Sequence, residues 1–284
     1  SLVGSEMCIR DRVRVVSSPV RRYFSGPLPR AIAHRGFAPA GGENTLEAFA
    51  AACANGADVM ETDVRASSDN VALTFHDSTL ARVAGGDPRA IAETPWSRLS
   101  TVRVHGRGTI TRLDDALASF PDLPFNIDVK AASAIEPTVA AIARTGAGRR
   151  VCLTSFDPAV AREVVSRASS ACGHQVMASA SRTTVAVFLA ASWLGAERLC
   201  TRVLARYAAL QVPIRYKGLP ILTPRFVAAA HRAGCEIHGW TIDDEPAMHA
   251  LFDMGVDGIV SNRVDRLVKV REARATRRTG PGRE

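Results

Sequence analysis

The chain has 284 residues, of which 46% are hydrophobic and 23% are charged, and this composition is that of a globular protein with one large core or two small ones. Its formal net charge of +8 belongs to the two ends. Residues 1–30 and 266–284 together hold 13 basic and 4 acidic side chains, whereas residues 31–265 hold 23 basic and 24 acidic ones. The near-neutral body argues against a nucleic-acid-binding protein.

The six cysteines lie at irregular spacings without a C-x-x-C pair, which argues against a zinc site and against a disulfide framework. No run approaches the roughly 18 to 20 apolar residues that span a bilayer, and no secretory signal is visible. We therefore expect a cytoplasmic protein with free thiols and without stable membrane insertion.

The two ends of the chain are expected to lie outside the folded domain. Residues 1–12, SLVGSEMCIRDR, show no periodicity and are interpreted as a sequencing artefact, so the true start of the chain, and with it export, stays open. Residues 1–29 are assigned to an N-terminal segment. Residues 269–284 are polar and basic and end in a Gly/Pro-containing stretch, so we expect a disordered tail.

Between residues 30 and 268, short apolar or β-branched runs alternate with Ala-rich stretches of helical period, which predicts a single α/β domain with a parallel sheet. Nine runs qualify as strands, one too many for an eight-stranded barrel. Only six residues separate the second and third runs, too few for a parallel crossover, so the third is expected to fold back on the second or to lie outside the barrel. The nine runs are residues 31–36, 58–64, 71–77, 125–130, 150–156, 175–179, 209–213, 236–242 and 258–262.

A helix is predicted to begin shortly after the first strand. Asn44 as N-cap, with Glu47 three residues later, resembles a capping box, and Gly56 is a natural residue to follow the helix end. The apolar stripe between them consists of Leu46, Phe49, Ala50 and Cys53.

Carboxylates share one face on two of the predicted strands. Alternation along METDV places Glu61 and Asp63 together, and alternation along FNIDVK places Asp128 and Lys130 together. Charged side chains on a buried strand are costly unless they are paired or bind a metal. Three carboxylates that meet at the strand ends would form an all-oxygen site for a hard divalent cation such as Mg²⁺ or Ca²⁺.

Basic side chains stand at the ends of two other runs. His34 and Arg35 end the first run, and His76 lies near the end of the third. Lys130 is informative because the chain has 3 lysines against 33 arginines. A single histidine at a strand end is more often structural, but two histidines and two cations beside three carboxylates favour a general acid and a general base around a phosphodiester.

The motifs HRG, ENTLEAF, GADVMETDV, FHD, NIDVK, WTID and GVDGIVSNR, in this order, resemble the glycerophosphodiester phosphodiesterase family from about residue 30 to residue 265. The resemblance implies a TIM-type (β/α)8 barrel over residues 30–268, with its active site at the C-terminal face of the strands. It also implies metal-dependent hydrolysis of a small-molecule glycerophosphodiester to glycerol 3-phosphate and an alcohol. The implied cofactor is a divalent cation, Mg²⁺ or Ca²⁺, with Mn²⁺ as a third candidate.

The resemblance assigns roles to individual residues. Asp128 departs from the family pattern, which usually has Glu there; the shorter side chain could draw the metal toward this strand, admit a bridging water or change the metal preference, and we do not expect it to abolish binding. Glu43 and Asn44 match the family's ENT, with Asn44 equally suited to capping the helix. The implied roles are acid and base for His34 and His76, metal ligands for Glu61, Asp63 and Asp128, phosphate contacts for Arg35 and Lys130, and pocket walls for Trp240 and Phe156.

Two other functions are compatible with the sequence. The same scaffold and metal could serve a lysophospholipase D-type enzyme, or an enzyme in which a substrate hydroxyl attacks and leaves a cyclic phosphate. A non-catalytic barrel that binds phosphate esters is the third interpretation, and the intact set of histidines and carboxylates argues against it. The compact stretch from Ser78 to Thr111 favours small water-soluble diesters, and the oligomeric state stays open.

Overall fold

The structure is a computed structural model that describes residues 26–279. Its centre is a ring of eight parallel strands in the spatial order β7-β6-β5-β2-β1-β12-β11-β8, and a parallel bridge between Ser179 and Ala209 brings the two ends of this series together. The predicted (β/α)8 barrel is therefore confirmed. Its strands are β1 (Arg30–His34), β2 (Val59–Ala66), β5 (Phe125–Val129), β6 (Val151–Thr154), β7 (Met177–Ala178), β8 (Ala209–Val212), β11 (Glu236–Gly239) and β12 (Gly258–Ser261).

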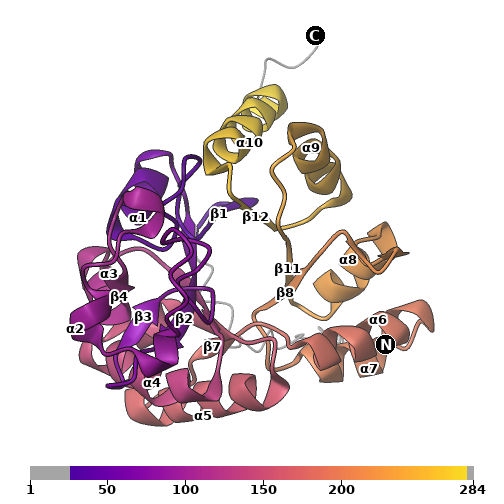
Figure 1. The fold of residues 1–284 in the computed structure, drawn as a ribbon. Helices are drawn as coiled ribbons and strands as arrows, with labels where there is room; N and C mark the ends of the chain where they lie inside the picture. The colour runs from indigo at the N-terminus through magenta and orange to yellow at the C-terminus, as the bar shows by residue number, and fades with distance from the viewer. Residues whose placement is uncertain (1–25, 280–284) are drawn as a thin grey trace, which may run out of the picture.

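Helices surround the strands, and each barrel strand is followed by at least one helix before the next strand or the end of the chain (Figure 1). Their apolar sides pack on the outward-facing residues of the strands and form the large core of the molecule. No helix of the described part of the chain is long and apolar enough to cross a membrane. The helices are α1 (Leu46–Ala54), α3 (Leu113–Ser119), α4 (Ile135–Arg144), α5 (Pro158–Cys172), α6 (Arg182–Trp193), α7 (Glu197–Leu204), α8 (Pro224–Arg232), α9 (Glu245–Met254) and α10 (Val264–Thr279).

An insertion, residues 67–112, separates β2 from α3. Its first strand, β3 (Ala72–Thr74), pairs antiparallel with the end of β2, so of the two alternatives for the third predicted run, the one in which it folds back on its predecessor is found. β4 (Thr111–Arg112) pairs with β3. Between them lies a small core of its own, which includes Leu80, Val83, Ile91 and Leu99. The other insertion elements are α2 (Trp96–Leu99) and the 3₁₀ turns η2 (Ile91–Glu93) and η3 (Val104–Gly106).

Three further short elements complete the chain. They are the 3₁₀ turns η4 (Ala132–Ala134) and η5 (Ala147–Arg149) and the two-stranded hairpin of β9 (Arg215–Tyr216) and β10 (Leu219–Pro220).

Along the barrel axis a buried ionic cluster of Arg30, Glu236 and His238 is followed by an apolar layer and then by a second charged layer. Ile32, Val59 and Val260 form a small cluster with Trp240 packed against it. Two residues further along β1 and β2 on the same faces come His34 and Glu61, in line with the period of two in a strand. This second charged layer thus lies toward the C-terminal ends of the strands, and the apolar cluster separates it from Arg30 and Glu236.

The start of α1 differs from the prediction by one residue. Its N-cap is Thr45, whose Oγ1 accepts from the amide of Ala48 at 3.2 Å, so the Asn44 cap predicted from the sequence is wrong. Asn44 has a positive φ of 58°, and its side chain is engaged elsewhere, as described below. Gly56 follows the helix end with a φ of +80°, as expected.

The C-terminal tail is more ordered than predicted. Residues 269–279 are the second part of α10, so the expected disorder is wrong there, whereas residues 280–284 lie outside the described part. The helix continues because α10 packs on β1 and α9, burying Val268 and Val270. Arg271 also pairs with Asp58 of the barrel. The predicted artefact at residues 1–12 and most of the N-terminal segment also fall outside the described residues.

Candidate active site

Strand pairing brings the predicted site residues together at the C-terminal end of the barrel. The last residue of β1, His34, lies beside Glu61 of β2, and Asp63 of β2 lies beside Asp128 of β5. These neighbours follow directly from the parallel registers. Lys130 comes immediately after β5, on the same side as Asp128.

Asp63 is the centre of the charged layer. Its Oδ1 lies 2.8 Å from Nζ of Lys130, and its Oδ2 lies 2.9 Å from Nε of Arg35. The same Lys130 donates to Oδ2 of Asp128 at 2.5 Å. Asn44 adds a hydrogen bond from its Nδ2 to Oδ2 of Asp63, and its own Oδ1 accepts from Thr62. Asn44 therefore supports the site, in agreement with the supporting role that the sequence left open.

Arg35 is held in a strained backbone conformation. Its φ is +57°, in the left-handed region that a β-carbon disfavours, and its amide donates to the Glu61 carboxylate at 3.1 Å. Its Nη1 also donates to Oε1 of Glu43 at 3.0 Å. Gly36 follows with a φ of +86°, and a β-carbon there would come within 2.8 Å of Ala48 atoms. The HRG turn thus directs the arginine side chain across the strand ends.

The two histidines each have one ring nitrogen fixed by a neighbour. Nδ1 of His34 lies 2.7 Å from Oδ1 of Asn262, and its Nε2 lies 3.9 Å from the Glu61 carboxylate. Nδ1 of His76 lies 2.7 Å from Oδ1 of Asp77. Because a carboxylate can only accept, His76 carries its proton on Nδ1 and turns Nε2 away from Asp77.

Two aromatic rings form an apolar wall next to these charges. Phe156 and Trp240 make an edge-to-face contact with their centroids 6.0 Å apart, and Nζ of Lys130 lies 5.5 Å from the centroid of Phe156. Phe156 is 59% exposed, so it stands at the rim of the barrel mouth. Contacts and strand pairing thus join the nine residues predicted from the sequence into one region, with His76 reaching it from the turn after β3.

Burial and neighbouring charges shift the pKa values of this layer in different directions. Burial, followed by repulsion from Asp63, raises the pKa of Glu61 well above its usual range. Burial acts the same way on Asp63, but Lys130 and Arg35 outweigh it and hold the pKa of that carboxyl below its usual range. Burial raises the pKa of Asp128 in spite of Lys130. Burial, and then Arg35, lower the pKa of His34.

The match to known proteins is extensive. The model of the glycerophosphoryl diester phosphodiesterase family matches residues 34–266, which is most of the chain. The chain belongs to the glycerophosphoryl diester phosphodiesterase family. A curated relative from Mycobacterium tuberculosis, named probable glycerophosphodiester phosphodiesterase 2, is 38% identical over 248 residues, which cover 86% of this chain and 91% of the relative.

Solved structures share the barrel. A putative glycerophosphoryl diester phosphodiesterase from Silicibacter pomeroyi has a TM-score of 0.70 and 19% identity, and covers 90% of this chain and 97% of its own. An Oleispira antarctica phosphodiesterase, solved in complex with the product sn-glycerol-3-phosphate, has a TM-score of 0.68 and 22% identity, with 86% and 97% covered. At these identities the likeness shows the fold.

Some residues of this family member escaped the sequence analysis. Asp77 and Asn262, which bind the two histidines, each lie within a quoted motif, FHD and GVDGIVSNR, but neither was assigned a role. Asp243 holds Asn262 in turn, accepting from its Nδ2 at 2.8 Å. His238 is a buried histidine outside this set, and its Nε2 lies 3.1 Å from Oε2 of Glu236 at the opposite end of the barrel.

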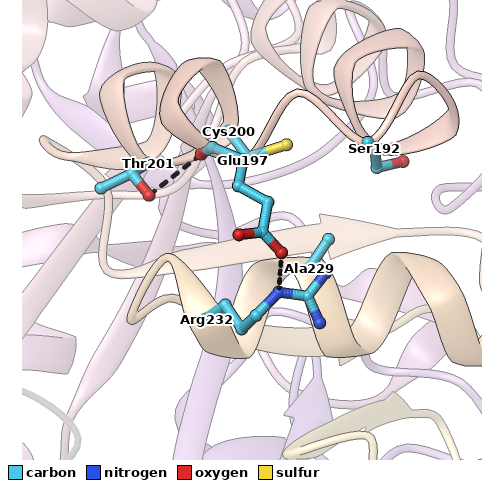
Figure 2. Close-up of a pocket in the computed structure, with 7 residues that line it drawn as sticks. Ser192, Glu197, Cys200, Thr201, Ala229 and Arg232 are labelled. Atoms are coloured by element: carbon cyan, nitrogen blue, oxygen red, sulfur yellow. Dashed lines mark hydrogen bonds and ion pairs between the residues drawn. The ribbon is translucent and has the colours of Figure 1, made fainter.

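A pocket of about 290 Å³ lies elsewhere, among α6, α7 and α8, and it includes none of the predicted site residues (Figure 2). Glu197 and Arg232 form an ion pair across it, with Nε and Oε1 2.9 Å apart. Burial raises the pKa of the nearby Cys200 thiol, which keeps this sulfur protonated and unreactive. The residues predicted from the sequence of this family member lie at the barrel mouth, away from this pocket.

Proposed function

We propose that the chain hydrolyses glycerophosphodiesters to glycerol 3-phosphate and an alcohol. The observation that carries the proposal is the joint position of two differently held histidines, two cationic side chains and three carboxylates at the C-terminal mouth of a family barrel. A phosphodiester needs one group that takes a proton, one that gives a proton, and fixed positive charge near its oxygens. The mouth holds a candidate for each.

His34 is suited to accept the proton of the attacking water. The amide of Asn262 is oriented by Asp243, so its Oδ1 faces His34 and keeps the ring proton on Nδ1. This leaves a lone pair on Nε2. Burial and Arg35 lower the pKa of His34, which keeps the ring neutral at neutral pH.

His76 is suited to donate a proton to the leaving oxygen. Asp77 holds its Nδ1, so Nε2 is the nitrogen that can exchange a proton with a ligand. The two histidines thereby act from different segments, β1 and the turn after β3.

Arg35 and Lys130 are suited to hold the phosphate. Each now pairs with Asp63, and Lys130 also pairs with Asp128. A bound phosphate would share these cations with the carboxylates, and charge-assisted hydrogen bonds to its oxygens would offset the negative charge that grows in the transition state.

The carboxylates fit a hard divalent cation by their chemistry. Oδ1 of Asp128 is buried without a hydrogen-bond partner, and burial, followed by repulsion from Asp63, raises the pKa of Glu61. Among the described residues, no three or more His, Cys, Asp or Glu side chains lie close enough together in their present arrangement to hold a metal ion. Lys130 instead pairs with two of the carboxylates, Asp63 and Asp128. We propose that Glu61, Asp63 and Asp128 would hold the cation. When bound it would supply further positive charge beside the phosphate.

The decisive experiment measures glycerol 3-phosphate release from glycerophosphocholine, glycerophosphoethanolamine and glycerophosphoglycerol. The purified chain is assayed with Mg²⁺, Ca²⁺, Mn²⁺ or EDTA, beside His34→Ala and His76→Ala. We expect metal-dependent release that falls by about two to four orders of magnitude in either variant, the usual size of acid and base effects. No release from folded wild-type protein with any metal would contradict the proposal, and a cyclic phosphate product would replace hydrolysis by internal attack.

A lysophospholipid is a second candidate substrate, because the exposed ring of Phe156 offers an apolar contact at the rim of the mouth. The same assay with lysophosphatidylcholine distinguishes the two. Choline release from the lysolipid that exceeds release from glycerophosphocholine, and that falls in Phe156→Ser, would favour the lysophospholipase D reaction.

A further inference from the structure

Arg82 lies in the insertion, yet its side chain reaches back to the barrel mouth. It lies beyond β3 and is 46% exposed. Its Nε donates to Oδ2 of Asp77 at 2.6 Å, its Nη1 donates to Oε2 of Glu43 at 3.2 Å, and its Nη2 donates to Oε1 of Glu43 at 2.6 Å. A surface arginine with a bidentate bond to one carboxylate and a further bond to a second is held in a defined place.

Each of the two carboxylates also contacts a residue of the proposed machinery. The other oxygen of Asp77 accepts from Nδ1 of His76, and Oε1 of Glu43 accepts from Nη1 of Arg35. Glu43 belongs to the loop between β1 and α1, and Asp77 to the turn after β3. Arg82 is therefore two hydrogen bonds away, through one carboxylate in each case, from the candidate acid and from the candidate phosphate contact, which come from separate parts of the chain.

The guanidinium of Arg82 is engaged by protein. Both of its terminal nitrogens and its Nε donate to Glu43 or Asp77. Without Arg82, the carboxylates of Asp77 and Glu43, which now bind the same guanidinium, would repel each other. Only Arg35 and His76 would then offset their negative charge. The arrangement suits a structural link better than a contact with substrate.

We propose that Arg82 is a positioning residue that holds His76 and Arg35 at a fixed separation across the barrel mouth by bridging Asp77 and Glu43. The inference rests on the proposed function, since it gives those two residues their roles. Arg82 acts through the carboxylates and contacts neither the reacting phosphate nor the attacking water.

The test compares Arg82→Gln with Arg89→Gln. Arg89 lies in the same insertion, is 41% exposed, and pairs with Asp87, so its replacement removes an equivalent surface ion pair that does not lead to the site. We expect Arg82→Gln to lower kcat for the diester about 10- to 100-fold, the size seen when supporting partners of a site are removed, with KM changed less than about threefold. Arg89→Gln should keep both parameters within about twofold of wild type.

Conservative and double variants show whether Arg82 works through its partners. Arg82→Lys keeps the charge but cannot form the fork to Glu43 together with the bond to Asp77, so its kcat should lie between those of wild type and Arg82→Gln. In an Asp77→Asn, Glu43→Gln background, Arg82→Gln should cost much less than it does alone. If Arg82→Gln lowers kcat as much in that background as it does alone, the inference is overturned. A raised KM with unchanged kcat would also overturn it, because that result indicates direct substrate binding.

An NMR measurement of the His76 ring nitrogens gives a readout that needs no turnover. Arg82→Gln should alter the Nδ1 signal of His76 and broaden it, whereas Arg89→Gln should leave it unchanged; equal spectra in all three proteins would overturn the inference. If the wild-type protein releases no product, the proposed function fails, and the ring spectrum still decides whether Arg82 holds His76.

Discussion

The barrel and the insertion contribute to the same site in different ways. Glu61, Asp63 and Asp128 stand on barrel strands, are nearly fully buried, and have their positions set by backbone pairing on both sides. His76 and Arg82 come from the insertion and are about one-third to one-half exposed. Strand pairing can hold charges in place in the interior, whereas groups on a loop depend on side-chain bonds to keep their positions.

The two regions also have separate apolar cores. The large core lies between the strands and the helix layer, and the small core of the insertion contains Leu73, Phe75 and Leu80 among others. β3 joins them, because it pairs with β2 and places Ala72 in the large core and Leu73 in the small one. Because Phe75 of the small core directly precedes His76, we expect a disturbance of this core to affect His76 more than a disturbance of the helix layer does.

The largest effect is expected from truncating each core. Leu80→Ala in the insertion and Ile142→Ala in α4 both remove a fully buried side chain, and each should lower the free energy of unfolding by about 2–5 kcal/mol. Only Leu80→Ala should also lower kcat at a temperature where both variants are folded. Urea unfolding together with initial rates measures both quantities, and an equal loss of kcat in the two variants would show that the insertion does not position the site independently.

A pH profile tests the role of the buried histidine of the barrel, His34. Because burial and Arg35 lower the pKa of His34 from its ordinary value of 6.5, the base stays neutral below that pH, and the acid limb of kcat/KM should lie below pH 6.5. The free energy of unfolding should also fall with pH in this range. As pH falls, the histidine of the unfolded chain is protonated at a higher pH than His34 in the folded protein, so the contribution of His34 to stability is lost as pH falls through its folded-state pKa.

Asn262→Leu sharpens that measurement. Its hydrogen bond acts to raise the pKa of His34, so losing it should move the acid limb to still lower pH. An acid limb at or above pH 6.5 in wild type, or one that rises in the variant, would contradict the assignment of His34 as the base.

The smallest effects are expected at two neighbouring residues, of which Thr45 caps α1 and Asn44 supports the site. Thr45→Ala removes the N-cap of α1 and should lower the free energy of unfolding by about 1 kcal/mol while kcat stays within about twofold. Asn44→Ala removes the hydrogen bond to Asp63 and should lower kcat more than Thr45→Ala does. Thermal unfolding and initial rates measure the pair, and the reverse pattern would restore Asn44 as the cap.

Much of the barrel was accessible from sequence because local patterns determine it. Each of the nine predicted runs overlaps a strand, and the six-residue spacing between two of them excluded a parallel crossover, which leaves the antiparallel return of β3 as one of two alternatives. Alternation placed Glu61 with Asp63 and Asp128 with Lys130, and the observed registers agree. The N-cap of α1 was harder to predict because Asn44 and Thr45 both suit that position. The order of the basic C-terminal tail was also harder to predict, because it depends on the packing of α10 on the barrel.

The sequence by itself determined where the strands lie and which of them carry the charged site residues. Through its motifs it also determined the family. Only the tertiary structure decided which carboxylate each cation binds, that Asn262 and Asp77 orient the two histidines, and that Arg82 connects Glu43 with Asp77. Local patterns follow from the short-range geometry of helices and strands, but these contacts join segments up to 228 positions apart in the chain. Their partners are set by the closure of the barrel and the fold of the insertion, which no periodicity in the sequence records.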